Sequence, residues 1–340
     1  MTTSHRSLIA AALALAACKV SQGPPPAPSQ AAAPTTQADT APTKVPANIS
    51  HGEAPVGTTN TPPPIDAAAP ALTAAPVVKV RFEIKNERLA VDSNVAYEGW
   101  TFDGRAPGPV IRVRQGSTVD FTLVNKAPMT HSMDFHAAEI APSKHYVNVQ
   151  PGDSLHYQFV ARVPGVFLYH CGTAPTAAHI ANGMFGAVIV DPAGGRPPAK
   201  EFVIVQSEFY GVPLAGQTTP LYLDWNKLMN QAPDYVVFNG RVNQYARHPV
   251  EVKVGELLRV YVVNAGPNRI SSFHVVGAIF ERAFLDGSMS HPLEGVQTVN
   301  VPVGGSGIFE LRLREAGTYP FVTHAFADAT KGAVGMFEAK

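Results

Sequence analysis

Short runs of alternating apolar and polar residues begin near residue 78 and continue through the rest of the chain. Three of them are Val78–Ile84, Val110–Val113 and Val119–Val124, and Gly, Pro or Asn residues separate them. Alternation of this kind is typical of strands that bury one face, and turn residues at this spacing favour an antiparallel sandwich. Because no long segment has helical periodicity, the pattern predicts an all-β protein.

The strand pattern occurs twice along the chain. In both copies nine positions separate a Gly that follows one strand from an Asn that ends the next. The matched segments are Ile111–Gly116 with Val250–Gly255, and Pro164–Tyr169 with Ala316–Phe321. We therefore expect two tandem Greek-key β-sandwich domains, residues 78–194 and 195–340, because one duplicated domain explains both matches.

The first 77 residues follow a different pattern. An apolar run from Leu8 to Ala17 precedes Cys18, and a run of about ten residues is too short to span a bilayer but suits an export signal. Leu15–Cys18 resembles a bacterial lipobox, so residues 1–18 are predicted to be a lipoprotein signal peptide with Cys18 lipidated. The alternative is an ordinary signal that is cleaved nearby, with Cys18 incidental.

Residues 19–77 are rich in Pro, Ala and Thr and contain few large apolar residues. Such a segment buries too little surface to offset its conformational entropy, so we expect a disordered tether. Lys19 is not the acidic residue that resembles an inner-membrane retention signal. The predicted location is therefore the outer membrane or the periplasmic face of a bacterial envelope.

Charge and cysteine content exclude some functions. The chain of 340 residues has 26 basic and 26 acidic side chains, so its formal net charge is zero and nucleic acid is not an expected partner. Its two cysteines, Cys18 and Cys171, lie in such different settings that a disulfide between them is not expected.

Cys171 begins a run of residues that suits a metal. Seven residues separate it from His179, and four more separate His179 from Met184. A thiolate, two imidazoles and a weak axial thioether are the ligands of a blue-copper site, and His131 upstream supplies the second imidazole. The alternative is that Cys171 is a free thiol that packs in the core and binds no metal. The second sequence copy has no Cys at the corresponding end, so it should lack such a site.

His170, next to Cys171, indicates a second metal. Neighbouring residues of a strand point to opposite faces, so His170 and Cys171 cannot easily serve one ion. In an extended segment with a two-residue period, His136 and Asp134 point to the same face and His131 points to the opposite one. This places His136 with His170. Three histidines with one open position suit a catalytic metal. The candidates for the third histidine are His324 and His274.

At these residues the sequence resembles the copper-containing nitrite reductases, and among them the lipid-anchored outer-membrane enzymes of the neisserial type. The resemblance covers about residues 78–340. The segments that carry it are Thr130–Ala138, His170–Met184, Val236–Gly240, Ser272–His274 and Thr323–His324.

The resemblance implies two cupredoxin-type domains and a one-electron, two-proton reduction of nitrite to nitric oxide and water, as in denitrification. The electron would arrive at a type 1 copper and pass through Cys171 and His170 to a type 2 copper. The type 1 ligands it implies are His131, Cys171, His179 and Met184, and the type 2 ligands are His136, His170 and His324. Asp134 and His274 would handle protons. A homotrimer, in which His324 serves a neighbouring chain, and a c-type cytochrome or small cupredoxin as electron donor are also implied.

Some positions depart from the family pattern. Val276 stands where the family usually has Ile, which predicts a slightly roomier pocket, and Ile140–Val149 does not resemble the neisserial version. Gln297 and Thr298 fall where residues that support the catalytic His274 are expected.

Two other functions are open to a chain with these motifs. A lipid-anchored electron carrier would need the type 1 site alone, whereas His136, His170 and His324 are present together. A laccase-like multicopper oxidase would need His-x-His pairs and a His-Cys-His element, and Cys171 is followed by Gly172.

Overall fold

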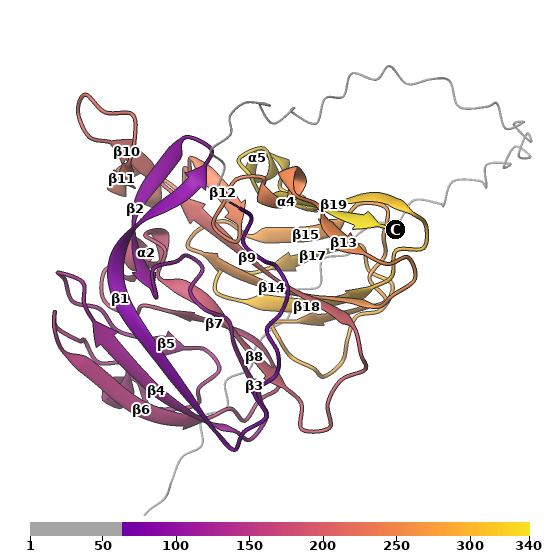
Figure 1. Ribbon diagram of the computed structural model, residues 1–340, viewed down its shortest axis with the longest axis horizontal. Helices are drawn as coiled ribbons and strands as arrows, with labels where there is room; N and C mark the ends of the chain where they lie inside the picture. Colours follow the sequence, from indigo (N-terminus) through magenta and orange to yellow (C-terminus); the bar gives the residue numbers. More distant parts are fainter. Residues whose placement is uncertain (1–62) are drawn as a thin grey trace, which may run out of the picture. The chain divides into compact units, whose positions relative to one another are not determined.

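Each half of the chain forms two facing β-sheets in the computed structural model, which describes residues 63–340 (Figure 1). The predicted signal peptide, Cys18 and most of the predicted tether lie outside the described residues. The predicted all-β class with two sandwiches is confirmed, because alternating apolar side chains from paired sheets fill a core in each half.

The first sandwich pairs a sheet of order β2-β1-β4-β6 with a sheet of order β3-β8-β7-β5. Its strands are β1 (Val77–Asp92), β2 (Val95–Phe102), β3 (Ile111–Arg114), β4 (Thr118–Asn125), β5 (Asp134–Phe135), β6 (Ser154–Val160), β7 (Gly165–His170) and β8 (Phe185–Asp191). Two short strands from the second half, β10 (Gly211–Pro213) and β11 (Leu221–Leu223), extend the first of these sheets beyond β2.

The second sandwich repeats this arrangement with sheets of order β12-β9-β14-β18-β16 and β13-β20-β19-β15-β17. Its strands are β9 (Lys200–Phe209), β12 (Tyr235–Phe238), β13 (Val250–Val252), β14 (Leu258–Gly266), β15 (Ser271–Val275), β16 (Arg282–Leu285), β17 (Thr298–Val301), β18 (Ser306–Leu311), β19 (Gly317–Thr323) and β20 (Val334–Ala339). The parallel pair β1–β4 corresponds to the parallel pair β9–β14, so the two halves share one topology.

Short helices lie in the connections. They are α1 (Pro142–His145), α2 (Thr176–Ala181), α3 (Trp225–Met229), α4 (Gln244–Arg247) and α5 (Phe326–Ala329). Within residues 63–340, none of the helices has the length and apolar character that crossing a membrane requires. Helix α2 lies in the connection from β7 to β8 and begins five residues after Cys171.

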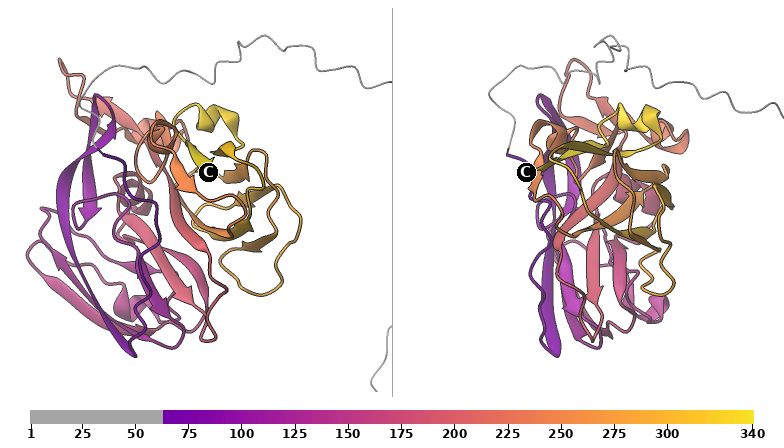
Figure 2. Two further views of the ribbon diagram at one scale, coloured as in Figure 1. Left: turned by 45° about the vertical axis from the view of Figure 1, so that its right-hand side comes forward. Right: turned by 90° about the vertical axis from the view of Figure 1, so that its right-hand side faces the viewer.

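The two sandwiches lie side by side (Figure 2). They pack through an apolar layer between β7 and β8 of the first and β9 and β14 of the second. Buried ion pairs reinforce the joint. The Arg112 guanidinium lies 2.7 Å from both the Asp191 and the Glu201 carboxylates, and so links the end of β8 to the start of β9. This interface between the sandwiches stabilises one of the two sheet faces on which the candidate metal ligands lie.

The end of the predicted tether differs from expectation. Residues 63–76, which we expected to lack structure, run along both sandwiches. The backbone of Ala68 pairs with Phe202, and Thr73 pairs with Val113. The Tyr245 hydroxyl donates to the Ile65 carbonyl at 2.9 Å. This segment has no core of its own, and its order comes from backbone and side-chain partners on the sandwiches, which local composition does not reveal.

Candidate metal centres

Three predicted type 1 ligands converge in the first sandwich. His131 lies before β5, Cys171 follows β7, and His179 is on α2. The Nδ1 atoms of the two histidines are 3.1 Å apart, and the Cys171 sulfur lies 3.2 Å from His179 Nδ1 and 3.9 Å from His131 Nδ1. All three side chains are buried, so the donor atoms face one another away from water.

Backbone hydrogen bonds hold these residues in place and bring Met184 beside them. His131 exchanges two backbone hydrogen bonds with Val149, at 3.2 and 2.7 Å. The Cys171 N–H donates to the Met184 carbonyl at 3.1 Å, and the Met184 N–H donates to the His179 carbonyl at 3.2 Å. The buried Met184 is therefore tied directly to two of the other three candidates.

Burial keeps both imidazoles of this cluster neutral. It lowers the pKa of His131 to about 3, with a further contribution from nearby His179, and lowers the pKa of His179 to about 4. Burial raises the pKa of the Cys171 thiol, and hydrogen bonds from the backbone N–H groups of Ser132 and Thr173 oppose that rise. Metal binding needs neutral imidazole and thiolate, so the two histidines are ready and the cysteine releases a proton when it binds.

A second cluster lies on the other face of the same strand pair. The Nε2 atoms of His136 and His170 are 3.1 Å apart, and an Asp134 carboxylate oxygen is 3.9 Å from His170 Nε2. Asp134 stands opposite His170 in the β5–β7 ladder. His170 Nδ1 donates to the Cys171 carbonyl at 2.9 Å, which leaves Nε2 facing His136. Burial and the neighbouring His170 lower the pKa of His136, which favours its neutral ring.

The donor atoms of both clusters fit metal ions. Bonds of about 2.0 Å to nitrogen and about 2.3 Å to sulfur place ligand atoms roughly 3 to 4 Å from one another. The observed separations of 3.1 to 3.9 Å lie in this range. A His₂Cys set with Met suits copper, and imidazole alone suits copper as well. The side chains at 170 and 171 serve separate clusters, as the two-residue period predicts.

The remaining two candidate histidines lie together in the second sandwich. The ring centroids of His274 and His324 are 5.5 Å apart. His274 Nδ1 donates to the Gln297 carbonyl at 2.7 Å, and His274 pairs with Thr298 across β15 and β17. Within residues 63–340 of one chain, neither histidine belongs to the group formed by Asp134, His136 and His170.

Comparisons with known proteins agree with this ligand chemistry. Residues 83–194 match the family model described as multicopper oxidase. The copper-containing nitrite reductase of Neisseria gonorrhoeae is 39% identical over 346 residues, which cover 98% of this chain and 86% of that protein. The chain belongs to the copper-containing nitrite reductases.

Other members of the copper-containing nitrite reductases are similarly close. That of Neisseria meningitidis serogroup A is 40% identical over 285 residues, covering 82% of this chain and 72% of the relative. The solved structure of the Nitrosomonas europaea copper nitrite reductase has a TM-score of 0.72 at 36% identity, covering 78% of this chain and 94% of that chain. The predicted copper cofactors are confirmed: the protein has a type 1 copper site and a second, histidine-rich site.

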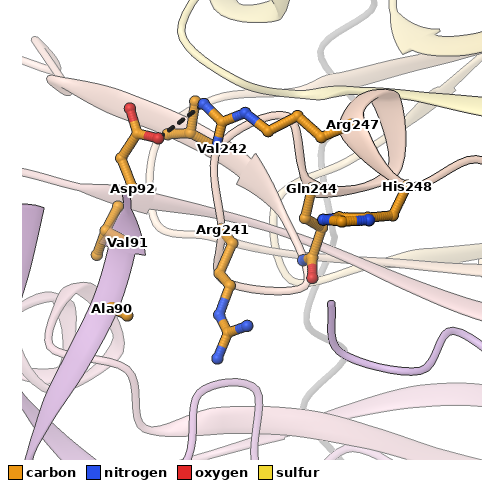
Figure 3. A pocket seen from close by; sticks show the side chains of 8 residues that line it. All are labelled: Ala90, Val91, Asp92, Arg241, Val242, Gln244, Arg247 and His248. Carbon is orange, nitrogen blue, oxygen red and sulfur yellow. Dashed lines mark hydrogen bonds and ion pairs between the residues drawn. The ribbon is translucent and has the colours of Figure 1, made fainter. Parts of the chain in front are cut away.

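The small cavity drawn in Figure 3 lies elsewhere in this copper-containing nitrite reductase. It lies between the end of β1 and α4, beside the ion pair of Arg247 and Asp92, and its volume of about 10 Å³ suits about one water molecule. None of the candidate ligands lines it, so we assign it no part in the metal chemistry.

Sequence reasoning missed three residues beside the type 1 cluster. They are Ser132, Asn148 and Thr173, whose side chains form a hydrogen-bonded chain behind the Cys171 sulfur. Polar residues next to Cys171 were visible in the sequence, but the contact with Asn148 depends on how a distant loop folds back.

Proposed function

We propose that this protein reduces nitrite to nitric oxide and water with two copper ions held by named residues. His131, Cys171, His179 and Met184 hold the type 1 copper, and His136, His170 and His324 hold the type 2 copper. The observation that carries the proposal is that consecutive residues, His170 and Cys171, take part in separate donor clusters. Copper, when bound, supplies a reversible one-electron couple and a position for the anion.

The chain's own residues prepare the electron path between the two clusters. The covalent path from the Cys171 sulfur to the His170 ring runs through the two side chains and the peptide bond that joins these adjacent residues. The hydrogen bond from His170 Nδ1 to the Cys171 carbonyl fixes the ring, so Nε2 is the atom left for the second cluster. Burial of Cys171 keeps water from this path.

Asp134 and His274 handle the two protons that the reaction consumes. The Asp134 side chain is one-third exposed and lies 3.9 Å from His170 Nε2, so it can both reach the reacting anion and exchange protons with water. His274 Nδ1 donates a hydrogen bond to the Gln297 carbonyl, which leaves Nε2 as the ring atom that can exchange a proton with the departing oxygen.

The third ligand comes from a neighbouring chain in a homotrimer. His324 is exposed and lies away from His136 and His170 of its own chain. The exposed Phe326 packs against His324, with ring centroids 4.6 Å apart. Ile270, Val276 and Ile279, close in sequence to His274, are also exposed. Exposed apolar side chains of this kind favour an interaction surface, and here contact with a second copy would complete an unfinished site.

Substitution of one ligand from each cluster tests the two-site assignment. The His136→Ala protein should lose nitric oxide production from nitrite while it keeps the intense absorbance of the type 1 copper. The Cys171→Ala protein should lose that absorbance. Each should contain about one copper per chain instead of about two. Full turnover by His136→Ala protein would refute the second site, and a native copper content near one would favour an electron carrier.

Mixing two inactive variants tests the shared site. His136→Ala and His324→Ala chains each lack one ligand, but a mixed trimer can combine the intact His136 of one chain with the intact His324 of another. If chains mix at random, about one quarter of the sites are complete, so about a quarter of the activity returns. Without sharing between chains, the mixture stays inactive.

We further propose the domain limits 78–194 and 195–340, and export to the bacterial envelope with a lipid on Cys18. A small c-type cytochrome or cupredoxin supplies the electron. Support comes from the lipobox-like Leu15–Cys18 and from the similarity to the neisserial proteins. The Cys18→Ala protein should not incorporate labelled fatty acid and should leave the membrane fraction. Membrane retention without label would contradict the anchor.

A further inference from the structure

Ser132, Thr173 and Asn148 connect three loops behind the Cys171 sulfur, and the proposed function uses none of them. Ser132 and Thr173 are buried, whereas Asn148 is exposed and comes from the segment before β6. This segment also holds His131, through the backbone of Val149. The three side chains therefore join the loops of two proposed copper ligands.

The direction of each hydrogen bond follows from what each atom can donate. Thr173 Oγ1 is 2.9 Å from Asn148 Oδ1 and 3.1 Å from Ser132 Oγ. An amide oxygen only accepts, so the single Thr173 hydroxyl proton is donated to Asn148. Thr173 Oγ1 can then accept the proton of Ser132, whose own oxygen accepts from the Gly172 N–H at 3.1 Å. Both hydroxyl protons are thereby used.

In this arrangement neither hydroxyl proton reaches the Cys171 sulfur, which accepts from the backbone N–H groups of Ser132 and Thr173. The Ser132 backbone nitrogen donates to the sulfur at 3.3 Å, but the Ser132 hydroxyl oxygen lies 4.0 Å from it. We propose that Asn148 sets the reduction potential of the type 1 copper by drawing the Thr173 and Ser132 protons away from the Cys171 sulfur. This inference rests on the proposed role of Cys171 as a copper ligand.

The electronic consequence has a definite sign. Hydrogen bonding around the cysteine sulfur tunes the potential of a blue-copper site. A donated proton withdraws electron density from the sulfur, weakens its donation to the oxidised metal and so favours the reduced state. Asn148 therefore keeps the potential low, and its loss should release at least one hydroxyl proton toward the sulfur.

The test is the Asn148→Leu variant of the copper-loaded protein. We expect its ratio of reduced to oxidised type 1 copper at a fixed electrode potential to rise about tenfold, which is about 59 mV for one electron. The sulfur-to-copper absorption band should shift to higher energy. A merely structural role for Asn148 predicts neither shift in this direction.

Gln150→Leu is the matched control. Gln150 Oε1 accepts from the Thr130 hydroxyl at 2.9 Å beside His131, so the substitution removes the same kind of bond from the same loop without reaching Cys171. It should leave the potential and the band unchanged. An equal shift in both variants, or an unchanged or lowered potential in the Asn148→Leu protein, would overturn the inference.

Thr173 gives a second pair of variants if Asn148→Leu protein does not fold. Thr173→Val removes the acceptor of the Ser132 proton and should raise the potential, whereas Thr173→Ser keeps a hydroxyl and should retain the native value. No difference between the two would also overturn the inference. A native protein without the absorption band would refute Cys171 as a copper ligand, which is a separate failure.

Discussion

The two sandwiches build the same pocket, but only the first fills it with metal ligands. Six residues after the Gly that begins β7 comes Cys171, and six after the Gly that begins β19 comes Thr323. The Cys171 N–H donates to the Met184 carbonyl at 3.1 Å, and the Thr323 N–H donates to the Ala333 carbonyl at 3.3 Å.

The equivalence extends to the side-chain acceptors. The Ser132 N–H donates to the Cys171 sulfur at 3.3 Å, and the Ser272 N–H donates to the Thr323 hydroxyl at 3.1 Å. By the same register Ser271 replaces His131. Asp328 replaces His179, because each lies five residues before the residue whose carbonyl accepts from Cys171 or Thr323, namely Met184 and Ala333. The shared fold thus supplies the backbone, and four side chains decide whether the pocket can bind copper.

The largest expected effect comes from replacing Cys171 of the first pocket with Thr, the residue at the corresponding position of the second pocket. The Cys171→Thr protein should lose the type 1 absorbance and its nitrite turnover, because a neutral hydroxyl cannot replace a thiolate as a soft ligand. Absorbance spectra and copper content check this. The second cluster should keep its copper, and retained blue colour would show that the comparison is wrong.

An ion pair with a buried carboxylate replaces the metal in the second pocket. Arg269 Nε lies 2.9 Å from the Asp328 carboxylate, which is 3% exposed. Arg269→Leu should lower the free energy of unfolding by about 3 kcal/mol, because an unpaired carboxylate remains buried. Denaturant unfolding measures the change.

Arg312→Leu is its control, because the pair of Arg312 and Glu281 is more than a third exposed on both sides. Such a pair contributes at most about 1 kcal/mol. If Arg269→Leu lowered the free energy of unfolding no more than this control does, the ion pair would not be the counterpart of the metal. Neither substitution should alter the type 1 absorbance.

Two asparagines support the matching loops. The Asn125 amide donates to the carbonyls of Met129 and Val149, and the Asn264 amide donates to those of Arg269 and Val301.

Replacing either asparagine with Ala should cost about 2 kcal/mol, because two carbonyls, one of them in a buried hydrogen bond, lose a donor. The two costs should add in the double variant to within about 0.5 kcal/mol, since the sites are independent. Denaturant unfolding tests both statements. Only Asn125→Ala should also weaken copper binding, because its loop carries His131, and an equal loss from Asn264→Ala would argue against separate pockets.

A further expected effect is the pH dependence of the copper-free protein. The folded pKa values of His131 and His179, about 3 and about 4, lie below the ordinary value of 6.5. The unfolded chain therefore binds more protons below pH 6.5, and stability is lost as the pH falls toward 4. Unfolding at several pH values measures this slope. His131→Ser should reduce it, and an unchanged slope would assign it to other groups.

Periodicity predicted individual strands well where one face is buried. Val119–Val124 was expected to be a strand, and β4 runs from Thr118 to Asn125. The extension of β1 to Asp92 had no such signal, because the second part of that strand does not alternate regularly between buried and exposed positions. Likewise, the pairing of Leu221 with Tyr97 joins residues from different halves, which local patterns do not encode.

The sequence by itself determined the division of ligands at positions 170 and 171, because a two-residue period sends neighbouring side chains to opposite faces. It also determined the two-sandwich architecture, since the same strand pattern occurs twice along the chain. Only the tertiary structure decided that His274 and His324 lie apart from His136 and His170, and that Asn148 reaches Thr173. Such contacts depend on how distant loops and whole sandwiches pack, and no local period specifies that.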